Sequence, residues 1–276
     1  MYSSSLILLL LAVVVGSIHV QGSAAGLDLD FRDPHFEKYF LAVQNGLGRL
    51  EMFLKTKIGK NSFTGNISLN PEQMRLLINL VRKLAELKPA ESSITVCETG
   101  FNGGHSAVLY LESDPRVRYI GFDIGIYGSA KPAAQFIADQ YGPSRVSLIW
   151  GDSSKTVPSF IQASLNVCDL IVVDGGHDYE TCYADLKNLA QAAAEQAYVM
   201  VDDCAPINRL SMQASWERAV KEGLYHELQR KEVWNERTPN PVGTPGWCVG
   251  YRSSQPSQLD VLKAKLGQFA AIRPPM

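Results

Sequence analysis

Acidic side chains stand at the ends of five short apolar segments in this chain of 276 residues. In chain order they are Glu98, Asp123, Asp152, Asp174 and the pair Asp202 and Asp203. Carboxylates that lie close together repel one another, so a group of them needs a compensating charge, and a hard dication with oxygen ligands would supply it. A purely structural role, such as capping a helix or forming a turn, explains Asp174, Asp202 and Asp203 least well, because adjacent strands would bring these three carboxylates together.

Asp202 and Asp203 follow one another directly, and adjacent residues of a strand point to opposite faces. The two carboxylates can therefore share one ligand only if the backbone turns where the strand ends. Cys204-Ala205-Pro206 comes next and is consistent with such a turn, because proline disfavours helix in the residue before it.

The stretch VCETGFNGGHSA combines a glutamate with three glycines directly after an apolar run. Glycines there let a ligand approach the backbone closely, and Glu98 suits a ligand group that is cationic or donates hydrogen bonds. Glu98, Gly100 and Gly104 form the pattern Glu-x-Gly-x-x-x-Gly, which differs from the Gly-x-Gly-x-x-Gly of nicotinamide and flavin sites. The spacing argues against a nicotinamide oxidoreductase, while a plain tight turn is the structural alternative.

Four other residues each allow two interpretations. Asp152 is either a ligand contact or the N-cap of a helix, and Asp123 is either a ligand contact or part of a turn. His105, beside the glycines, is either a helix-start residue or a contact to a bound cofactor. Tyr179 is either a core aromatic or a cofactor contact.

Apolar runs alternate with helical patterns from about Asn70 onward. We expect strands over residues 94–98, 117–123, 145–150, 169–174, 197–203, 225–234 and 246–252, and helices over 105–113, 132–141, 155–163, 179–195 and 212–223. The first five strands are two-sided apolar runs, as in a parallel sheet covered by helices on both faces. The last two are joined by residues 235–245 without a helical pattern, which predicts an antiparallel hairpin.

The expected fold is therefore α/β, a doubly wound, mostly parallel seven-stranded sheet with an antiparallel final strand. Ligands of such sheets bind outside the carboxyl ends of the strands, which is where the acidic residues stand.

The chain begins with an unbroken apolar run, LILLLLAVVV, followed by small residues at Ser23–Ala25. Ten helical residues reach about half of the hydrocarbon thickness of a bilayer, so no stable membrane span is expected. We interpret residues 1–25 as a cleaved secretory signal, which predicts a protein of the secretory pathway or a secreted one. An uncleaved N-terminal membrane anchor is the alternative.

The remaining chain divides into three parts. Residues 26–69 are expected to form an N-terminal helix and loop, 70–252 the main domain, and 253–276 a C-terminal tail. Asp33-Pro34 and Asn70-Pro71 each predict a helix start, a capping residue followed by proline.

The five cysteines form no CxxC pair. Cys97 lies inside an apolar strand pattern, and we interpret it as a small buried hydrophobic residue. A disulfide among Cys168, Cys182, Cys204 and Cys248 is compatible with the sequence, but their spacing does not assign it.

Composition narrows the class of partner. Hydrophobic residues make up 46% of the chain, which is ordinary for a globular protein, and the formal net charge is −2. No basic run with interleaved aromatics occurs, so we expect no nucleic-acid partner. The sequence leaves a homo-oligomer open.

With these residues in place, the region from about Asn70 to Arg252 resembles the class I S-adenosylmethionine-dependent methyltransferases. The resemblance implies that S-adenosylmethionine is the cofactor and that the loop from Glu98 through Gly100 to Gly104 wraps its methionine moiety. It further implies that Asp123 binds the ribose hydroxyls and that Gly151, Asp152 and Ser153 line the adenine.

Within that class, VVDGGHDYE followed by VMVDD is similar to the metal-dependent small-molecule O-methyltransferases, most of all the group with the antibiotic-sugar enzymes. The resemblance implies that Asp174, Asp202 and Asp203 hold Mg²⁺ and that His177 is the base. A neutral imidazole can take the proton of a hydroxyl whose pKa a metal has lowered. Orientation of Asp174 by His177 is the alternative role.

The expected function is therefore Mg²⁺-assisted methyl transfer to a hydroxyl of a small molecule. The secretory-type N-terminus departs from the group, whose members usually work where S-adenosylmethionine is made. The competing hypothesis is a secreted, non-catalytic binding protein that retains the methyltransferase fold. The acidic strand ends favour the enzyme, because a scaffold has no reason to keep repelling carboxylates together.

Overall fold

The structure is a computed structural model that describes residues 33–59, 67–204, 210–232 and 246–252. The predictions for the signal segment 1–25 and for the tail 253–276 lie outside the described residues. Within the ranges given above, no helix combines the length and the apolar character that a membrane crossing requires.

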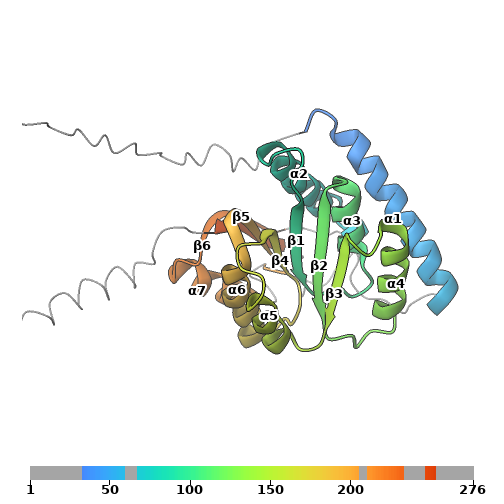
Figure 1. The fold of residues 1–276 in the computed structure, drawn as a ribbon. Coiled ribbons are helices and arrows are strands. Elements are labelled where there is room, and N and C mark those ends of the chain that lie inside the picture. The colour runs from blue at the N-terminus through green and yellow to red at the C-terminus, as the bar shows by residue number, and fades with distance from the viewer. Residues whose placement is uncertain (1–32, 60–66, 205–209, 233–245, 253–276) are drawn as a thin grey trace, which may run out of the picture.

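Helices and strands alternate after an N-terminal helical region (Figure 1). The elements are α1 (Phe36–Ile58), the 3₁₀ turn η2 (Ile67–Leu69), α2 (Pro71–Leu87), β1 (Ile94–Thr99), α3 (His105–Ser113), β2 (Val117–Asp123), α4 (Ala130–Tyr141), β3 (Val146–Trp150), α5 (Ser153–Ile161), β4 (Cys168–Val173), α6 (Tyr179–Ala192), β5 (Ala193–Asp202), α7 (Leu210–Lys221), β6 (Tyr225–Glu232) and β7 (Gly246–Arg252).

The strands form one seven-stranded sheet in the order β3-β2-β1-β4-β5-β7-β6. Pairs among β1 to β5 are parallel, whereas β7 runs antiparallel to both β5 and β6. The predicted fold class is confirmed, including the antiparallel hairpin of the last two strands.

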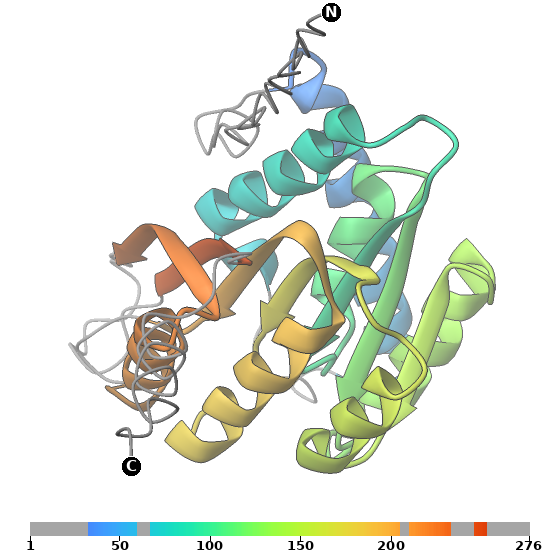
Figure 2. The same cartoon turned by 60° about the vertical axis from the view of Figure 1, so that its left-hand side comes forward.

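Each face of the sheet carries its own hydrophobic core. Helices α1 to α4 cover one face and α5 to α7 cover the other, as Figures 1 and 2 show. The alternation along β1 illustrates the division: Val96 packs into the first core and its neighbour Cys97 into the second. Strand β3 is an edge strand with half-buried and exposed residues, so the prediction of two-sided burial is wrong for it.

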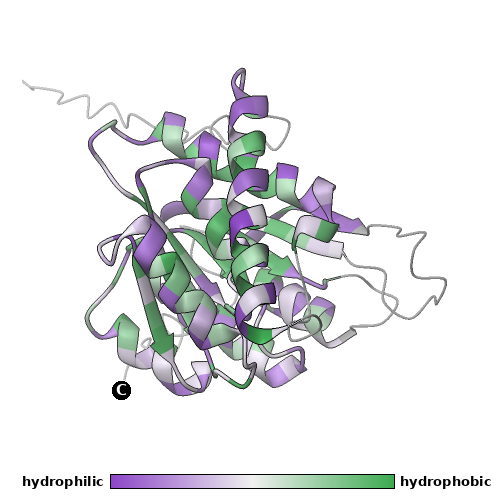
Figure 3. Cartoon of the chain, turned by 90° about the vertical axis from the view of Figure 1, so that its right-hand side faces the viewer, coloured by the Kyte–Doolittle hydropathy of each residue, from purple (hydrophilic) through white to green (hydrophobic). Residues whose placement is uncertain are grey.

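The predicted start of α2 is confirmed, and that of α1 is two residues too early. Asn70 accepts the backbone N–H of Gln73 at 3.2 Å, with Pro71 in the first turn. Asp33 instead accepts the N–H of His35 at 2.6 Å and forms an ion pair with Arg82 at 2.8 Å. Pro34 therefore lies in a turn, and α1 begins at Phe36. Figure 3, which faces this helix, shows hydrophilic and hydrophobic residues alternating along it.

Two disulfides join neighbouring strands. Cys97 of β1 is bonded to Cys168 of β4, and Cys204, just after β5, is bonded to Cys248 of β7. Cys97 is buried in the hydrophobic core, as predicted, but its disulfide was not expected. Strands β1 and β4 are adjacent, and the Cα atoms of Cys97 and Cys168 lie 5.7 Å apart, within disulfide range. Cys182 is a buried free thiol.

Candidate active site

The acidic strand ends form one row across the sheet. Thr99 pairs with Phe122 on one side and with Val173 on the other, and Val173 pairs with Val201. The residues that follow them are Gly100, Asp123, Asp174 and Asp202. The register therefore brings the predicted residues of β1, β2, β4 and β5 to the same edge.

The glycines after β1 are required by the protein's own packing. Gly100 has a φ of +94°, and a Cβ there would lie 1.9 Å from the carbonyl oxygen of Asp174. Gly104 has a φ of +77°, and a Cβ there would lie 2.5 Å from Cδ1 of Ile137. A larger side chain would separate β1 from β4 or α3 from α4, so these glycines serve the fold whatever the loop binds.

Glu98 lies beneath the loop and is only 1% exposed. Its carboxyl group accepts hydrogen bonds from the hydroxyls of Ser106 at 2.8 Å, Tyr110 at 3.2 Å and Tyr119 at 2.5 Å. Burial raises the pKa of Glu98 to about 8, against the opposing effect of these hydroxyls. Alternate residues of a strand point to the same face, so Glu98 and Val96 share one face of β1. This could have predicted that the side chain of Glu98 points under α3.

Asp123 connects two loops through hydrogen bonds to their backbone amides. One carboxylate oxygen accepts the N–H of Asn102 at 2.8 Å, and the other accepts that of Gly125 at 2.6 Å. Four exposed apolar side chains lie at the ends of β2 and β3, three of them just after β2 and one at the last residue of β3. We call them the rim patch, and they are Ile124, Ile126, Tyr127 and Trp150. An open apolar surface at this edge suits a flat organic group.

Asp152 and Ser153 begin α5 at the same rim. Asp152 caps the helix, since its carboxylate accepts the N–H of Ser154 at 2.9 Å, in line with the structural alternative. Sequence reasoning missed Asp185 of α6, which is 0% exposed beneath Gly175, with Thr99 and Ser153 beside it. Burial raises the pKa of Asp185 to about 6, and an acid on the apolar face of α6 was the available signal.

Asp174, His177 and Asp203 converge in one cluster, which we call the acid–histidine cluster. One ligand atom from each residue lies within 4.8 Å of the others. Nε2 of His177 is 3.6 Å from Oδ1 of Asp174 and 3.5 Å from Oδ2 of Asp203. Two carboxylate oxygens are suitable ligands for a divalent cation, and the imidazole nitrogen beside them can either join them or accept a proton.

The predicted backbone turn after β5 is present at Asp203, whose φ is +54°. Asp202 stays beside the cluster and is not one of its three members. Its Oδ1 accepts the N–H of Asp203 at 2.8 Å, and Gln73 of α2 lies beside its carboxyl group. Burial, followed by the negative charges of Asp174 and Asp203, raises the pKa of Asp202 well above its usual range.

Helix α7 holds the loop that carries His177. The Ser211 hydroxyl donates to the carbonyl oxygen of His177 at 2.7 Å, and the Ser215 hydroxyl donates to that of Tyr179 at 2.9 Å. Asp178 caps α6 by accepting the N–H of Thr181 at 2.9 Å. Sequence reasoning missed both serines, whose only signal is their four-residue spacing on one helix.

The two ambiguous aromatic residues are now placed. His105 is the first residue of α3 and is 4% exposed, and burial lowers its pKa to about 4, which supports the helix-start interpretation. Tyr179 is half-buried on the surface between α6 and α7, where it stacks on Tyr183 and accepts a hydrogen bond from Arg218.

Comparison with known proteins identifies the domain. Residues 97–204 match a family model described as a methyltransferase domain. No curated protein sequence matches the chain significantly.

Three solved structures illustrate the shared fold. The O-methyltransferase TomG of Streptomyces achromogenes, involved in tomaymycin synthesis and bound to S-adenosylmethionine, is 15% identical with a TM-score of 0.56, and the match covers 76% of this chain and 90% of that one. An O-methyltransferase of Bacillus cereus in complex with S-adenosylhomocysteine is 13% identical with a TM-score of 0.53, covering 83% and 95%. Cofactor-bound Rv0187 from MTB is 15% identical with a TM-score of 0.51, covering 83% and 94%.

These likenesses show the fold, and the family match covers the segment from Cys97 to Cys204 that carries the strand-end acids. Residues 97–204 are thus a methyltransferase domain, and the seven-stranded sheet around them has the fold of the O-methyltransferases described above.

Proposed function

We propose that this methyltransferase transfers a methyl group to a hydroxyl of a small molecule with the assistance of Mg²⁺. The acid–histidine cluster carries the proposal, because it joins two carboxylates and an imidazole at the strand-end edge. In a methyltransferase, a metal ion held by two acids can lower the pKa of an acceptor hydroxyl, and a base beside it can take the proton.

The cofactor would lie along the ends of β1, β2 and β3. Asp123 would receive the ribose hydroxyls, and the rim patch at Ile124 and Trp150 would cover the adenine, with Asp152 and Ser153 next to it. The methionine moiety would follow the loop from Gly100 to Gly104. Glu98 would act from beneath that loop, since its exposed fraction is only 1%.

Asp174 and Asp203 would hold the metal ion, and Asp202 would hold the backbone N–H of Asp203 beside them. When bound, the ion would supply the positive charge that lowers the pKa of the acceptor hydroxyl. His177 would take the hydroxyl proton at Nε2 while the acceptor oxygen bonds to the methyl carbon. The bond from that carbon to sulfur would break, and S-adenosylhomocysteine would leave.

We also propose that the protein matures in the secretory pathway, either as a secreted protein or anchored by its N-terminal segment. The apolar run at residues 6–15 supports this, and so do the two disulfides, which persist in oxidising compartments.

Calorimetry tests the cofactor and the metal. The purified chain is titrated with S-adenosylhomocysteine, with and without Mg²⁺, and then with Mg²⁺ alone. We expect binding of both ligands, and loss of Mg²⁺ binding but not of S-adenosylhomocysteine binding in Asp203→Asn. A wild-type chain that does not bind Mg²⁺ would leave a metal-free methyltransferase with His177 as its base.

Transfer of a tritiated methyl group from S-adenosylmethionine to panels of catechols, phenols and sugars identifies the acceptor class. His177→Gln should slow transfer by roughly two to four orders of magnitude while Mg²⁺ binding survives. His226→Gln, which changes an exposed histidine of the distant strand β6, is the matched control. Cofactor binding without transfer to any acceptor would favour the non-catalytic binding protein.

A further inference from the structure

The disulfide between Cys204 and Cys248 lies directly beside the acid–histidine cluster. Cys204 is the residue after Asp203, and Cys248 pairs with Val201 on the neighbouring strand β7. Both cysteines are 0% exposed, and the backbone N–H of Cys204 donates to the carbonyl oxygen of Gly246 at 3.1 Å. The residue that follows the second cluster acid is therefore fixed to β7 both covalently and by a hydrogen bond.

Asp203 adopts a backbone conformation that such a restraint would help to hold. Its φ of +54° lies in the left-handed region, which aspartate adopts more readily than most residues other than glycine but less readily than an extended conformation. This conformation turns the carboxylate of Asp203 toward His177 and Asp174, whereas a continued strand would send Asp202 and Asp203 to opposite faces. A backbone released at Cys204 would relax toward the more favourable extended conformation.

The second disulfide provides a comparison inside the same sheet. Cys97 and Cys168 are also 0% exposed, but they join two strands that a regular parallel ladder already aligns. Neither cysteine is a sequence neighbour of a cluster residue. Loss of this bond would remove a cross-link without freeing a member of the cluster.

We propose that the Cys204–Cys248 disulfide is a positioning element for the metal site, so that the site is complete only in the oxidised chain. This inference rests on the proposed metal-dependent function. Forming the bond removes two protons and two electrons from the two thiols, and a disulfide-bearing oxidant accepts them and becomes two thiols. The acid–histidine cluster would then assemble in an oxidising compartment and stay incomplete in a reducing one.

Paired variants test the inference with Mn²⁺ as the probe. The folded variants Cys204→Ser with Cys248→Ser, and Cys97→Ser with Cys168→Ser as the matched control, are titrated with Mn²⁺. The electron paramagnetic resonance signal of the free ion reports the unbound fraction. S-adenosylhomocysteine affinity and the midpoint of thermal unfolding are measured on the same samples.

We expect both pairs to lower the unfolding midpoint, because both remove a cross-link. Only the Cys204 and Cys248 pair should weaken Mn²⁺ binding, by about tenfold or more, the range for residues that orient metal ligands. S-adenosylhomocysteine affinity should stay within about threefold of wild type in both pairs, a change of less than about 1 kcal/mol.

Every other outcome overturns the inference. It fails if both pairs bind Mn²⁺ as wild type does, or if Mn²⁺ and S-adenosylhomocysteine affinities fall together. If the serine pair does not fold, Cys204→Ala with Cys248→Val replaces it, and failure of that pair would mean that the bond serves the whole fold. A wild-type chain that binds Mn²⁺ no better than Asp203→Asn would instead contradict the proposed function itself.

Discussion

At the amino ends of the strands the buried acids are paired with cations, whereas at the carboxyl ends they contact hydroxyls, backbone amides and an imidazole. Asp169, at the start of β4, is 2.6 Å from Lys88, and Asp114, before β2, contacts both Arg82 and Arg116. At the other end, the carboxyl group of Glu98 accepts hydrogen bonds from three hydroxyls, and Asp174 faces His177. The two edges of one sheet thus treat negative charge in opposite ways.

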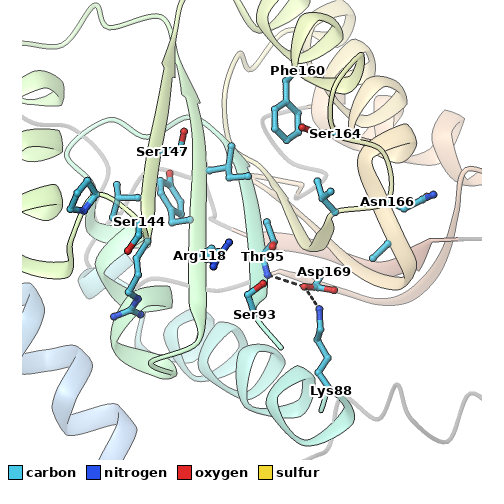
Figure 4. Close-up of a pocket in the computed structure, with 17 residues that line it drawn as sticks. Lys88, Ser93, Thr95, Arg118, Ser144, Ser147, Phe160, Ser164, Asn166 and Asp169 are labelled. Carbon is cyan, nitrogen blue, oxygen red and sulfur yellow. Dashed lines mark hydrogen bonds and ion pairs between the residues drawn. The ribbon is translucent and has the colours of Figure 1, made fainter. Parts of the chain in front are cut away.

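A pocket of about 530 Å³ lies at the amino ends of the strands (Figure 4). Its wall includes the Lys88–Asp169 pair, and Asp169 also accepts the N–H of Thr95 at 2.8 Å. The charge of this acid is compensated within the fold. The comparison teaches that burial alone does not mark a functional acid, because Asp169 is buried and is paired with Lys88.

The largest effect should come from Asp174→Asn at the carboxyl edge. Loss of a proposed ligand should weaken Mg²⁺ binding by at least about 100-fold, the upper end of what a lost orienting residue costs. The unfolding midpoint should not fall, because one negative charge leaves a group of repelling carboxylates. Calorimetry and thermal unfolding measure both quantities, and a lower midpoint with unchanged Mg²⁺ affinity would erase the contrast between the edges.

The opposite pattern is expected for Arg82→Ala. The variant leaves the buried carboxylates of Asp33 and Asp114 without this guanidinium, and breaking such a pair costs about 3–5 kcal/mol. Arg49→Ala removes an ion pair with Glu112 on a half-exposed side chain and should cost no more than about 1 kcal/mol. Urea unfolding gives both values, and S-adenosylhomocysteine affinity should be unchanged in the two variants.

The variant Glu98→Gln tests whether the buried carboxyl group of Glu98 makes the free energy of unfolding depend on pH. Burial raises the pKa of Glu98 from 4.5 to about 8, so between these values the folded chain holds a proton that the unfolded chain has released. The stabilisation is complete below pH 4.5 and is lost as the pH rises through about 8, by roughly a few kcal/mol. The isosteric glutamine should remove this slope. Parallel curves of unfolding free energy from pH 5 to 9 for the two proteins would contradict the assignment.

The sequence was sufficient to predict the row of strand-end residues but not the contacts among them. Apolar runs that end in an acid imply a common edge, because parallel strands present their carboxyl ends together, and Asp123 and Asp174 lie there. The turn after β5 could be inferred from Cys204-Ala205-Pro206. Which acid it would bring to His177 depends on the left-handed φ of Asp203, which no local pattern specified.

Long-range partners lay beyond the sequence for a similar reason. Cys97 pairs with Cys168 because β4 lies next to β1, and strand order is a property of the whole sheet. The hydroxyls around Glu98 come from α3 and β2, so their convergence required the packing of that helix on the sheet.

The smallest effect should come from Ser211→Ala, which removes the hydrogen bond to the His177 carbonyl without touching a charged group. A lost hydrogen bond of this kind costs about 1 kcal/mol, so methyl transfer to the best acceptor should fall on the order of fivefold. Ser159→Ala, on α5, removes an exposed helix serine that donates to the carbonyl of Lys155 and should leave the rate unchanged. Ser211→Thr keeps the hydroxyl and should restore the rate. Equal rates for Ser211→Ala and Ser159→Ala would mean that the carboxyl edge positions His177 through Asp174 and Asp203 alone.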